Sequence, residues 1–142
     1  MSSRLKGRRR QVSAVIDALI AWAKAQPDVT AVALVGSYAY DRPRMGSDVD
    51  LVLLTTSPDR HTEGLGWALA VDPRARLIRD RAWGPLRERR VRLRSGLQIE
   101  LGIVTPEWAA LPLDEGTATV LRDGCRILFD PDGVLDRAIA TL

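Results

Sequence analysis

Hydrophobic residues recur at helical spacing near the start of the chain and form continuous runs further along it. The helical spacing predicts an amphipathic helix that ends before Pro27, with a core-facing stripe at i, i+3, i+4, i+7, i+8 and i+11, made by Val12, Val15, Ile16, Leu19, Ile20 and Ala23. Two aliphatic, β-branched runs follow at residues 29–35 and 49–54. Runs of this length and composition predict interior strands of a sheet.

The second half of the chain predicts a hairpin between shorter helices. Alternation over 86–94, a Ser95-Gly96 turn and an aliphatic run over 97–104 predict two paired strands with arginines on their exposed face. Helices are expected at 61–71, ended by Pro73, from 105–107 onward, and at 132–142, with a last strand at 126–129. This order predicts an α/β (α+β) fold, a mixed sheet flanked by helices. A length of 142 residues predicts a single domain over 1–142.

Composition narrows the possible chemistry. Hydrophobic residues at 46% and charged residues at 27% are typical of a soluble globular protein, and no apolar run approaches the ~18 residues of a membrane span. The basic N-terminus lacks a signal-peptide pattern, so a cytoplasmic location without membrane contact is expected. One cysteine, Cys125, and one histidine, His61, exclude a disulfide scaffold and a Cys/His zinc site. We expect a buried Cys125 thiol, a His61 exposed in a loop, and tryptophans that serve packing.

Arginine dominates the positive charge. Of the 21 cations 19 are arginines, and nine of them lie between Arg74 and Arg94, against Asp80 and Glu88. Such a cluster fits phosphates, nucleic acid or an acidic partner, because the guanidinium fork binds phosphate in bidentate fashion. It also fits a solvated face. The net charge of only +3 favours the solvated face and disfavours a nucleic-acid binder.

The most informative residues lie where one predicted strand ends and the next begins. Asp48 and Asp50 are two residues apart on a strand, so both project from the same face. Two carboxylates held together at a buried strand repel each other unless a cation lies between them, and Mg²⁺ is the hard cation that prefers such ligands. Gly36 and Ser37 follow the preceding strand, where they either hold phosphate oxygens at a short helix N-terminus or form an ordinary turn with a serine cap.

A third carboxylate, Glu100, lies inside the aliphatic run 97–104. Its same-face neighbours, Gln98, Gly102 and Val104, are less hydrophobic than the opposite face. Glu100 either faces water or joins Asp48 and Asp50, and it joins them only if the hairpin lies against the strand at 49–54.

Taken together, these residues resemble the signature of the nucleotidyltransferases of the DNA polymerase β superfamily: Gly-Ser after a first strand, Asp-x-Asp on a second, and an acidic residue on a later strand. The ten residues between Ser37 and Asp48 are similar to the spacing in the minimal, stand-alone branch. The resemblance implies that Asp48, Asp50 and Glu100 bind two Mg²⁺ ions. It also implies that Gly36 and Ser37 hold the tail of ATP or another nucleoside triphosphate.

The same resemblance implies a magnesium-dependent transfer of a nucleoside monophosphate, AMP from ATP, to a hydroxyl of a small molecule or protein, with Glu100 accepting the proton. Ser47, Arg42 and Arg44 join the expected nucleotide site, although the two arginines equally fit a solvated loop.

Polymerising and antibiotic-modifying members carry an additional domain for the acceptor. In this short chain the acceptor site is therefore missing, supplied by a partner chain, or built from the arginine-rich hairpin. One alternative is an antitoxin that adenylylates a HEPN-type ribonuclease toxin; another is a nucleotide-binding module without turnover; a third is a nucleic-acid binder that uses the arginines of 74–94.

Overall fold

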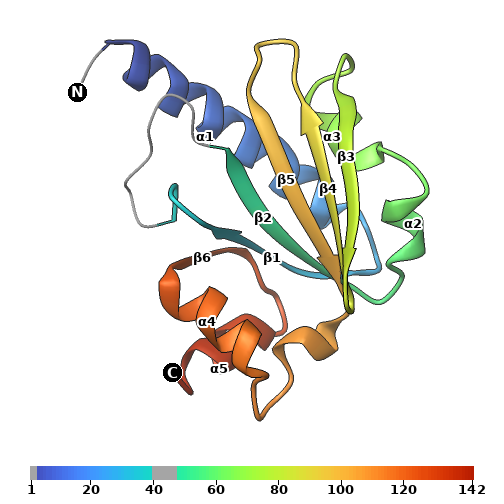
Figure 1. Ribbon diagram of the computed structural model, residues 1–142, viewed down its shortest axis with the longest axis vertical. Coiled ribbons are helices and arrows are strands. Elements are labelled where there is room, and N and C mark those ends of the chain that lie inside the picture. Colours follow the sequence, from blue (N-terminus) through green and yellow to red (C-terminus); the bar gives the residue numbers. More distant parts are fainter. Residues whose placement is uncertain (1–2, 40–47) are drawn as a thin grey trace.

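The computed structural model describes residues 3–39 and 48–142, and in these residues one mixed sheet is flanked by helices (Figure 1). The strands are β1 Val29–Val35, β2 Val49–Thr55, β3 Arg76–Trp83, β4 Leu86–Arg92, β5 Gln98–Val104 and β6 Cys125–Phe129. The helices are α1 Ser3–Lys24, α2 Asp59–Thr62, α3 Gly66–Val71, the 3-10 helix η1 Pro106–Ala109, α4 Glu115–Asp123 and α5 Val134–Ile139. The predicted α+β class with a mixed, helix-flanked sheet is confirmed.

The sheet has the order β3-β4-β5-β2-β1-β6. Every neighbouring pair is antiparallel except β2 and β5, which run parallel. The predicted hairpin is present as β4 and β5, and Gly96 in its turn has φ +90°, which a side chain would strain. A parallel pair needs a long crossover, and here the crossover from β2 to β5 carries α2, α3, β3 and β4.

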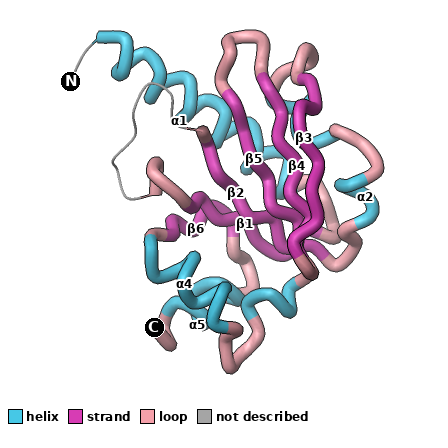
Figure 2. Tube along the Cα trace, viewed as in Figure 1, coloured by secondary structure: helices cyan, strands magenta, loops and turns pink. Residues whose placement is uncertain are grey.

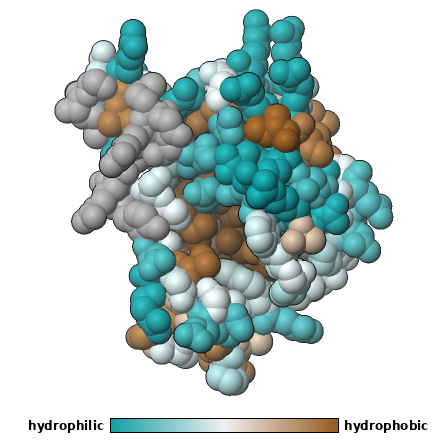
Figure 3. Space-filling model, in the orientation of Figure 1, coloured by the Kyte–Doolittle hydropathy of each residue, from teal (hydrophilic) through white to brown (hydrophobic). Residues whose placement is uncertain are grey.

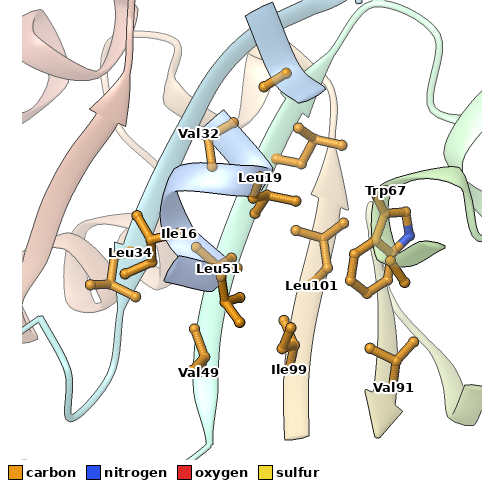
Figure 4. Packing of buried hydrophobic residues seen from close by; sticks show 14 of the residues in the cluster. Ile16, Leu19, Val32, Leu34, Val49, Leu51, Trp67, Val91, Ile99 and Leu101 are labelled. Carbon is orange, nitrogen blue, oxygen red and sulfur yellow. The ribbon is translucent and has the colours of Figure 1, made fainter. Parts of the chain in front are cut away.

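The two faces of the sheet carry separate hydrophobic clusters. Helices α1 and α3 cover one face, and η1, α4 and α5 cover the other (Figure 2). Strand alternation divides β2 between them: Leu51 and Leu53 pack under α1, whereas Val52 and Leu54 point to the side of α4 and α5. On the α1 face the predicted helix stripe meets the sheet, with Leu19 over Leu51 and the neighbouring aliphatic side chains (Figure 4). Burial of each such side chain contributes about 1.5–3 kcal/mol.

Some predicted elements have different bounds. Helix α1 begins at Ser3, ahead of its buried stripe. The single helix predicted at 61–71 is wrong: two short helices, α2 and α3, flank Gly64, whose carbonyl accepts a hydrogen bond from Arg89 at 2.7 Å. Strand β3 and helix α4 were not predicted. None of the helices in residues 3–39 and 48–142 has both the length and the hydrophobicity that crossing a membrane requires.

His61 is buried, and the prediction of an exposed loop residue is wrong. Its side chain is 5% exposed, its Nε2 lies 2.6 Å from Asp28 Oδ2, and its ring packs edge-on against Trp22 at 5.2 Å. The same carboxylate accepts hydrogen bonds from Thr55 at 2.6 Å and Arg60 at 2.9 Å. Although burial by itself raises the pKa of Asp28, the hydrogen bonds with Thr55 and His61 outweigh it and lower the pKa below 3.8. This network ties the start of β1 to the end of β2 and to α2.

Cys125 at the start of β6 is half-buried, and burial raises the pKa of its thiol to about 11.

Candidate active site

The parallel pairing of β2 and β5 places Glu100 directly opposite Asp50. Asp48 precedes β2 by one residue and shares the alternation of Asp50. All three carboxylates therefore lie on the face of the sheet that η1, α4 and α5 cover. The structure brings these three predicted residues together, and of the two alternatives for Glu100 it shows the one in which the hairpin lies against the second strand.

Gly36 directly follows β1 and lies beside Asp50. Its φ of +75° is a backbone conformation that favours glycine, and a Cβ built on it would overlap Asp50 Oδ2. The residues after it form a turn closed by the hydrogen bond from Ala39 N to Gly36 O at 2.9 Å, so Ser37 lies in a turn and not at a helix N-terminus. The turn still brings the backbone of Gly36 close to the Asp50 carboxylate. Arg42, Arg44 and Ser47 lie outside the described residues.

Two arginines, Arg79 and Arg90, occupy the carboxylate oxygens. Arg90 donates to Asp48 Oδ2 at 2.7 Å and to Glu100 Oε1 at 3.1 Å. Arg79 donates to Glu100 Oε1 at 2.7 Å and to Glu88 Oε1 at 3.0 Å. The sheet register causes this arrangement, because Arg90 pairs with Glu100 across β4 and β5 and with Arg79 across β3 and β4. Asp48, Asp50, Glu88 and Glu100 form the carboxylate cluster, and Arg79 and Arg90 are its counter-ions.

The prediction that the hairpin arginines lie on an exposed face is wrong for Arg89 and Arg90. The Arg90 and Arg79 side chains are 19% and 33% exposed, and Arg89, on the opposite face, is 7% exposed. Arg74, Arg76, Arg81, Arg87, Arg92 and Arg94 are exposed as predicted. The inward-facing arginines and Glu88 were not among the predicted site residues. Alternation along β4 could have placed Glu88 and Arg90 on the face opposite Val91 and Leu93, but it does not tell which strands lie beside β4.

The electrostatics of the carboxylate cluster differ sharply from residue to residue. Burial, followed by the hydrogen bond and the negative charge of Glu100 and the charge of Asp48, raises the pKa of Asp50 to about 7. Burial would also raise the pKa of Glu100, but hydrogen bonds with Glu88, Arg90 and Arg79 outweigh it and lower the pKa to about 2. Burial and then Glu100 raise the pKa of Glu88. Four carboxyl groups therefore share two arginines, and the shifts of Asp50 and Glu88 favour the protonated forms of these two side chains.

A cavity of about 590 Å³ opens beside the carboxylate cluster, between the sheet and the helices η1 and α4. Asp50, Glu88 and Glu100 line it together with hydrophobic residues of β2, the β3–β4 turn, η1 and α4. In Figure 3 it is the hydrophobic hollow near the centre of the face shown. A ligand in this cavity would lie against the carboxylates.

The carboxylate cluster has the donor chemistry of a magnesium site. All its donors are carboxylate oxygens, which Mg²⁺ prefers, and the pKa of Asp50 is raised by burial and by the neighbouring Glu100 and Asp48, whose charge a bound cation would offset. Within residues 3–39 and 48–142, however, no group of three or more acidic, histidine or cysteine side chains is arranged to hold a metal as it stands. Arg79 and Arg90 pair with oxygens of Asp48, Glu88 and Glu100, so a metal ion that bound these oxygens would have to displace the guanidiniums.

A mixed sheet with Gly-Ser at the end of one strand, Asp-x-Asp on the next and a glutamate in register with it defines a nucleotidyltransferase. Comparison with known families agrees: residues 18–107 match the family described as the nucleotidyltransferase domain, and the matched segment includes the whole carboxylate cluster. The chain belongs to this family and is a minimal nucleotidyltransferase of the DNA polymerase β superfamily. It is thus an enzyme of nucleotidyl transfer. No curated protein matched the chain.

Proposed function

We propose that this enzyme transfers a nucleoside monophosphate, AMP from ATP, to a hydroxyl group of a small molecule or protein, with Mg²⁺ bound by Asp48, Asp50 and Glu100. The observation that carries the proposal is the register of β2 and β5, which sets Asp50 opposite Glu100 and next to the glycine turn. Family membership supports nucleotidyl transfer in general. The nucleotide, the metal and the hydroxyl acceptor are the proposal's own additions.

The glycine turn is suited to the phosphate tail. Because Gly36 has no side chain, its backbone lies against Asp50, so phosphate oxygens held at this turn would lie next to the carboxylate cluster, and the Ser37 hydroxyl is a further donor there. When bound, Mg²⁺ would stabilise the charge that develops on the triphosphate and would activate the acceptor hydroxyl. Asp48 and Asp50 would hold the ions where the two strands meet.

The counter-ions have a second role in this proposal. A guanidinium is a bidentate partner for phosphate as well as for carboxylate. Once the carboxylate cluster binds metal, Arg79 and Arg90 are free to bind triphosphate oxygens that lie next to it. The two arginines therefore neutralise the cluster before the nucleotide arrives and neutralise the nucleotide afterwards.

The transfer step forms a bond between the acceptor oxygen and the α-phosphorus and breaks the bond from that phosphorus to the bridging oxygen of the β-phosphate. Pyrophosphate leaves, and the hydroxyl proton passes to a carboxylate of the cluster. We assign that proton to Glu100. Hydrogen bonds with Glu88, Arg90 and Arg79 hold the pKa of Glu100 at about 2, so Glu100 accepts a proton poorly and takes this role only after these partners have moved.

Label transfer tests the proposal directly. The protein is incubated with Mg²⁺, nucleoside triphosphates labelled at the α-phosphate, and a cell extract split into small-molecule and protein fractions. We expect label from ATP to appear in one fraction, to require Mg²⁺, and to disappear in Asp48→Asn, whereas Asp17→Asn on exposed α1 retains it. Binding of a nonhydrolysable triphosphate without label transfer from any of the four nucleotides would instead support a nucleotide-binding module without turnover.

A further inference from the structure

Arginines line a second hollow at the end of the sheet where β4 turns into β5, and we propose that this arginine hollow binds a free oligophosphate anion. It has a volume of about 550 Å³ and is lined by Arg74, Arg76, Arg92 and Arg94, together with Leu93, Ser95 and Gly96. The β4–β5 turn lies at the top of Figure 1, whereas α4, which lines the cavity beside the carboxylate cluster, lies at the bottom. The proposal concerns a separate site and does not depend on nucleotide transfer.

Ion pairing divides the nine arginines between Arg74 and Arg94 into two groups. Four of them pair with carboxylates of the strands, namely Arg79, Arg87, Arg89 and Arg90. The four guanidiniums of the arginine hollow make no hydrogen bond or ion pair with any residue of 3–39 or 48–142. The carboxylates near the hairpin are thus used by other arginines, and the positive charge of the hollow is available to a ligand.

Backbone contacts hold the four arginines next to one another. Arg76 lies directly opposite Arg92 in the register of β3 and β4. Asp72 joins the other two, because one of its carboxylate oxygens accepts a hydrogen bond from Arg74 N at 2.9 Å and the other from Arg94 N at 2.8 Å. This single carboxylate lies outside the lining of the hollow. A ligand therefore finds the four cations already gathered by the fold.

The pairing of Arg76 with Arg92 favours an anion that carries several charges. Like charges directly opposite each other on neighbouring strands destabilise a sheet, and an anion between them removes the repulsion. A guanidinium binds phosphate oxygens in bidentate fashion. An oligophosphate can contact several of the four guanidiniums at once, which a single phosphate group cannot do.

The rest of the lining disfavours two other polyanions. None of the described residues that line the hollow is aromatic, whereas proteins that bind single-stranded nucleic acid add aromatic side chains on which the bases stack. The hydrophobic residue of the lining, Leu93, is only 6% exposed, so the side chains of an acidic peptide would find no apolar surface. A free oligophosphate needs neither kind of contact.

The arginine hollow is a neighbour of the carboxylate cluster and uses different residues. Arg92 follows Arg90 by two positions, so both point to the same face of β4 and lie about 7 Å apart along the strand. The Arg90 guanidinium is held by Asp48 and Glu100, and none of the cluster residues lines the hollow. Binding at the hollow can therefore be measured in the absence of metal and nucleotide.

Calorimetric titration of the full chain with sodium tripolyphosphate, at low salt and without metal or nucleotide, tests the proposal. We expect binding that weakens as the salt concentration rises, and we expect Arg76→Gln with Arg92→Gln to reduce the affinity at least about tenfold. The matched control, Arg81→Gln with Arg122→Gln, removes the same charge at exposed positions outside the hollow and should reduce the affinity less than about twofold. Tripolyphosphate should also raise the melting temperature of the parent and of the control, but not of the variant.

A second variant and two further ligands make the test specific. Arg74→Gln with Arg94→Gln leaves the cross-strand pair intact and should also weaken tripolyphosphate binding at least about tenfold. A short thymidine oligonucleotide and a short polyglutamate peptide should bind more weakly than tripolyphosphate. The Arg76→Gln with Arg92→Gln variant should retain the magnesium-dependent binding of a nonhydrolysable ATP analogue that the parent shows.

Four results would overturn the proposal. They are no binding of tripolyphosphate at low salt, an equal loss of affinity in the control, an oligonucleotide or peptide that binds as tightly as tripolyphosphate and depends on the same arginines, and an equal loss of ATP-analogue and tripolyphosphate binding in the variant. The last result would make the hollow a part of the nucleotide site.

Discussion

Replacement of Asp50 tests the electrostatics of the carboxylate cluster most directly. In the metal-free protein its carboxyl has a pKa of about 7, raised mainly by burial and then by Glu100. Between pH 3.8 and about 7, the native state therefore keeps a proton on Asp50 that the unfolded chain, with a pKa of 3.8, has already lost. The stability that Asp50 contributes is fully present below pH 3.8 and is lost as the pH rises through about 7.

Asp50→Asn removes the charge while keeping the shape and a donor for the hydrogen bond to Glu100. The rise of the pKa from 3.8 to about 7 corresponds to about 4 kcal/mol at full value, and partial exposure of the carboxyl reduces this to about 1–3 kcal/mol. We expect the variant to be more stable than the parent by that amount near pH 8, and the gain to fall close to zero near pH 4. Urea unfolding in the presence of a chelator, followed by circular dichroism, measures both values.

Asp48→Asn is the control with the opposite expected sign. It removes the ion pair with Arg90 at 2.7 Å, so we expect a loss of about 0.5–1 kcal/mol near pH 8. If Asp50→Asn proved no more stable than the parent near pH 8, or if its gain were the same near pH 4, the buried proton would not exist and the description of the cluster would be wrong.

Three further predictions follow from contacts in the structure. Arg90→Gln removes the guanidinium that pairs with Asp48 and Glu100, so we expect the variant to bind Mn²⁺ about tenfold more tightly than the parent in the absence of nucleotide, as measured by electron paramagnetic resonance. Arg92→Gln, at an exposed position of β4, should leave the Mn²⁺ affinity unchanged. Equal affinities of the two variants would refute competition between Arg90 and the metal ion. Gly36→Ala and Gly96→Ala both place a side chain on a left-handed backbone, which costs about 1–2 kcal/mol, but only the Cβ at position 36 would overlap a carboxylate, that of Asp50. Gly36→Ala should therefore unfold at a lower urea concentration than Gly96→Ala and should lose triphosphate binding. Equal losses of stability in the two variants would contradict the close contact between Gly36 and Asp50. Asp28→Asn removes a buried carboxylate with three side-chain partners and should cost about 3–5 kcal/mol in the same unfolding assay; a loss below about 1 kcal/mol would refute its structural role.

The strands that could be predicted from the sequence are those that are buried and therefore rich in aliphatic residues. Strands β1, β2 and β5 pack between other elements on both faces, so they appear as aliphatic runs. Strand β3 lies at the edge of the sheet, and all its residues except Arg79 are exposed, so it shows no alternation. Helix α4 buries only Thr117 and Leu121, which is too little for a hydrophobic stripe.

The carboxylates of the candidate site could be predicted from the sequence, whereas the contacts of Arg79 and Arg90 with them could not. Asp48 and Asp50 follow from strand alternation alone, and Glu100 from its presence in an aliphatic run. Arg79 and Arg90 depend on which strands are neighbours and in what register, and both are properties of the folded sheet. His61 is a similar case, because its burial is set by a carboxylate 33 residues earlier in the chain.

The parallel pairing of β2 and β5 fixes the distance between the carboxylates of this site. Backbone hydrogen bonds of the ladder, and not the length of the intervening chain, set the spacing between Asp50 and Glu100. Residues added in the loops that join α2, α3 and β3 would lengthen the crossover without altering that spacing. One residue added within β5 ahead of Glu100 would turn its side chain toward α1 and dismantle the site. Natural or engineered variation in length is thus tolerated across the crossover and forbidden along a few residues of one strand.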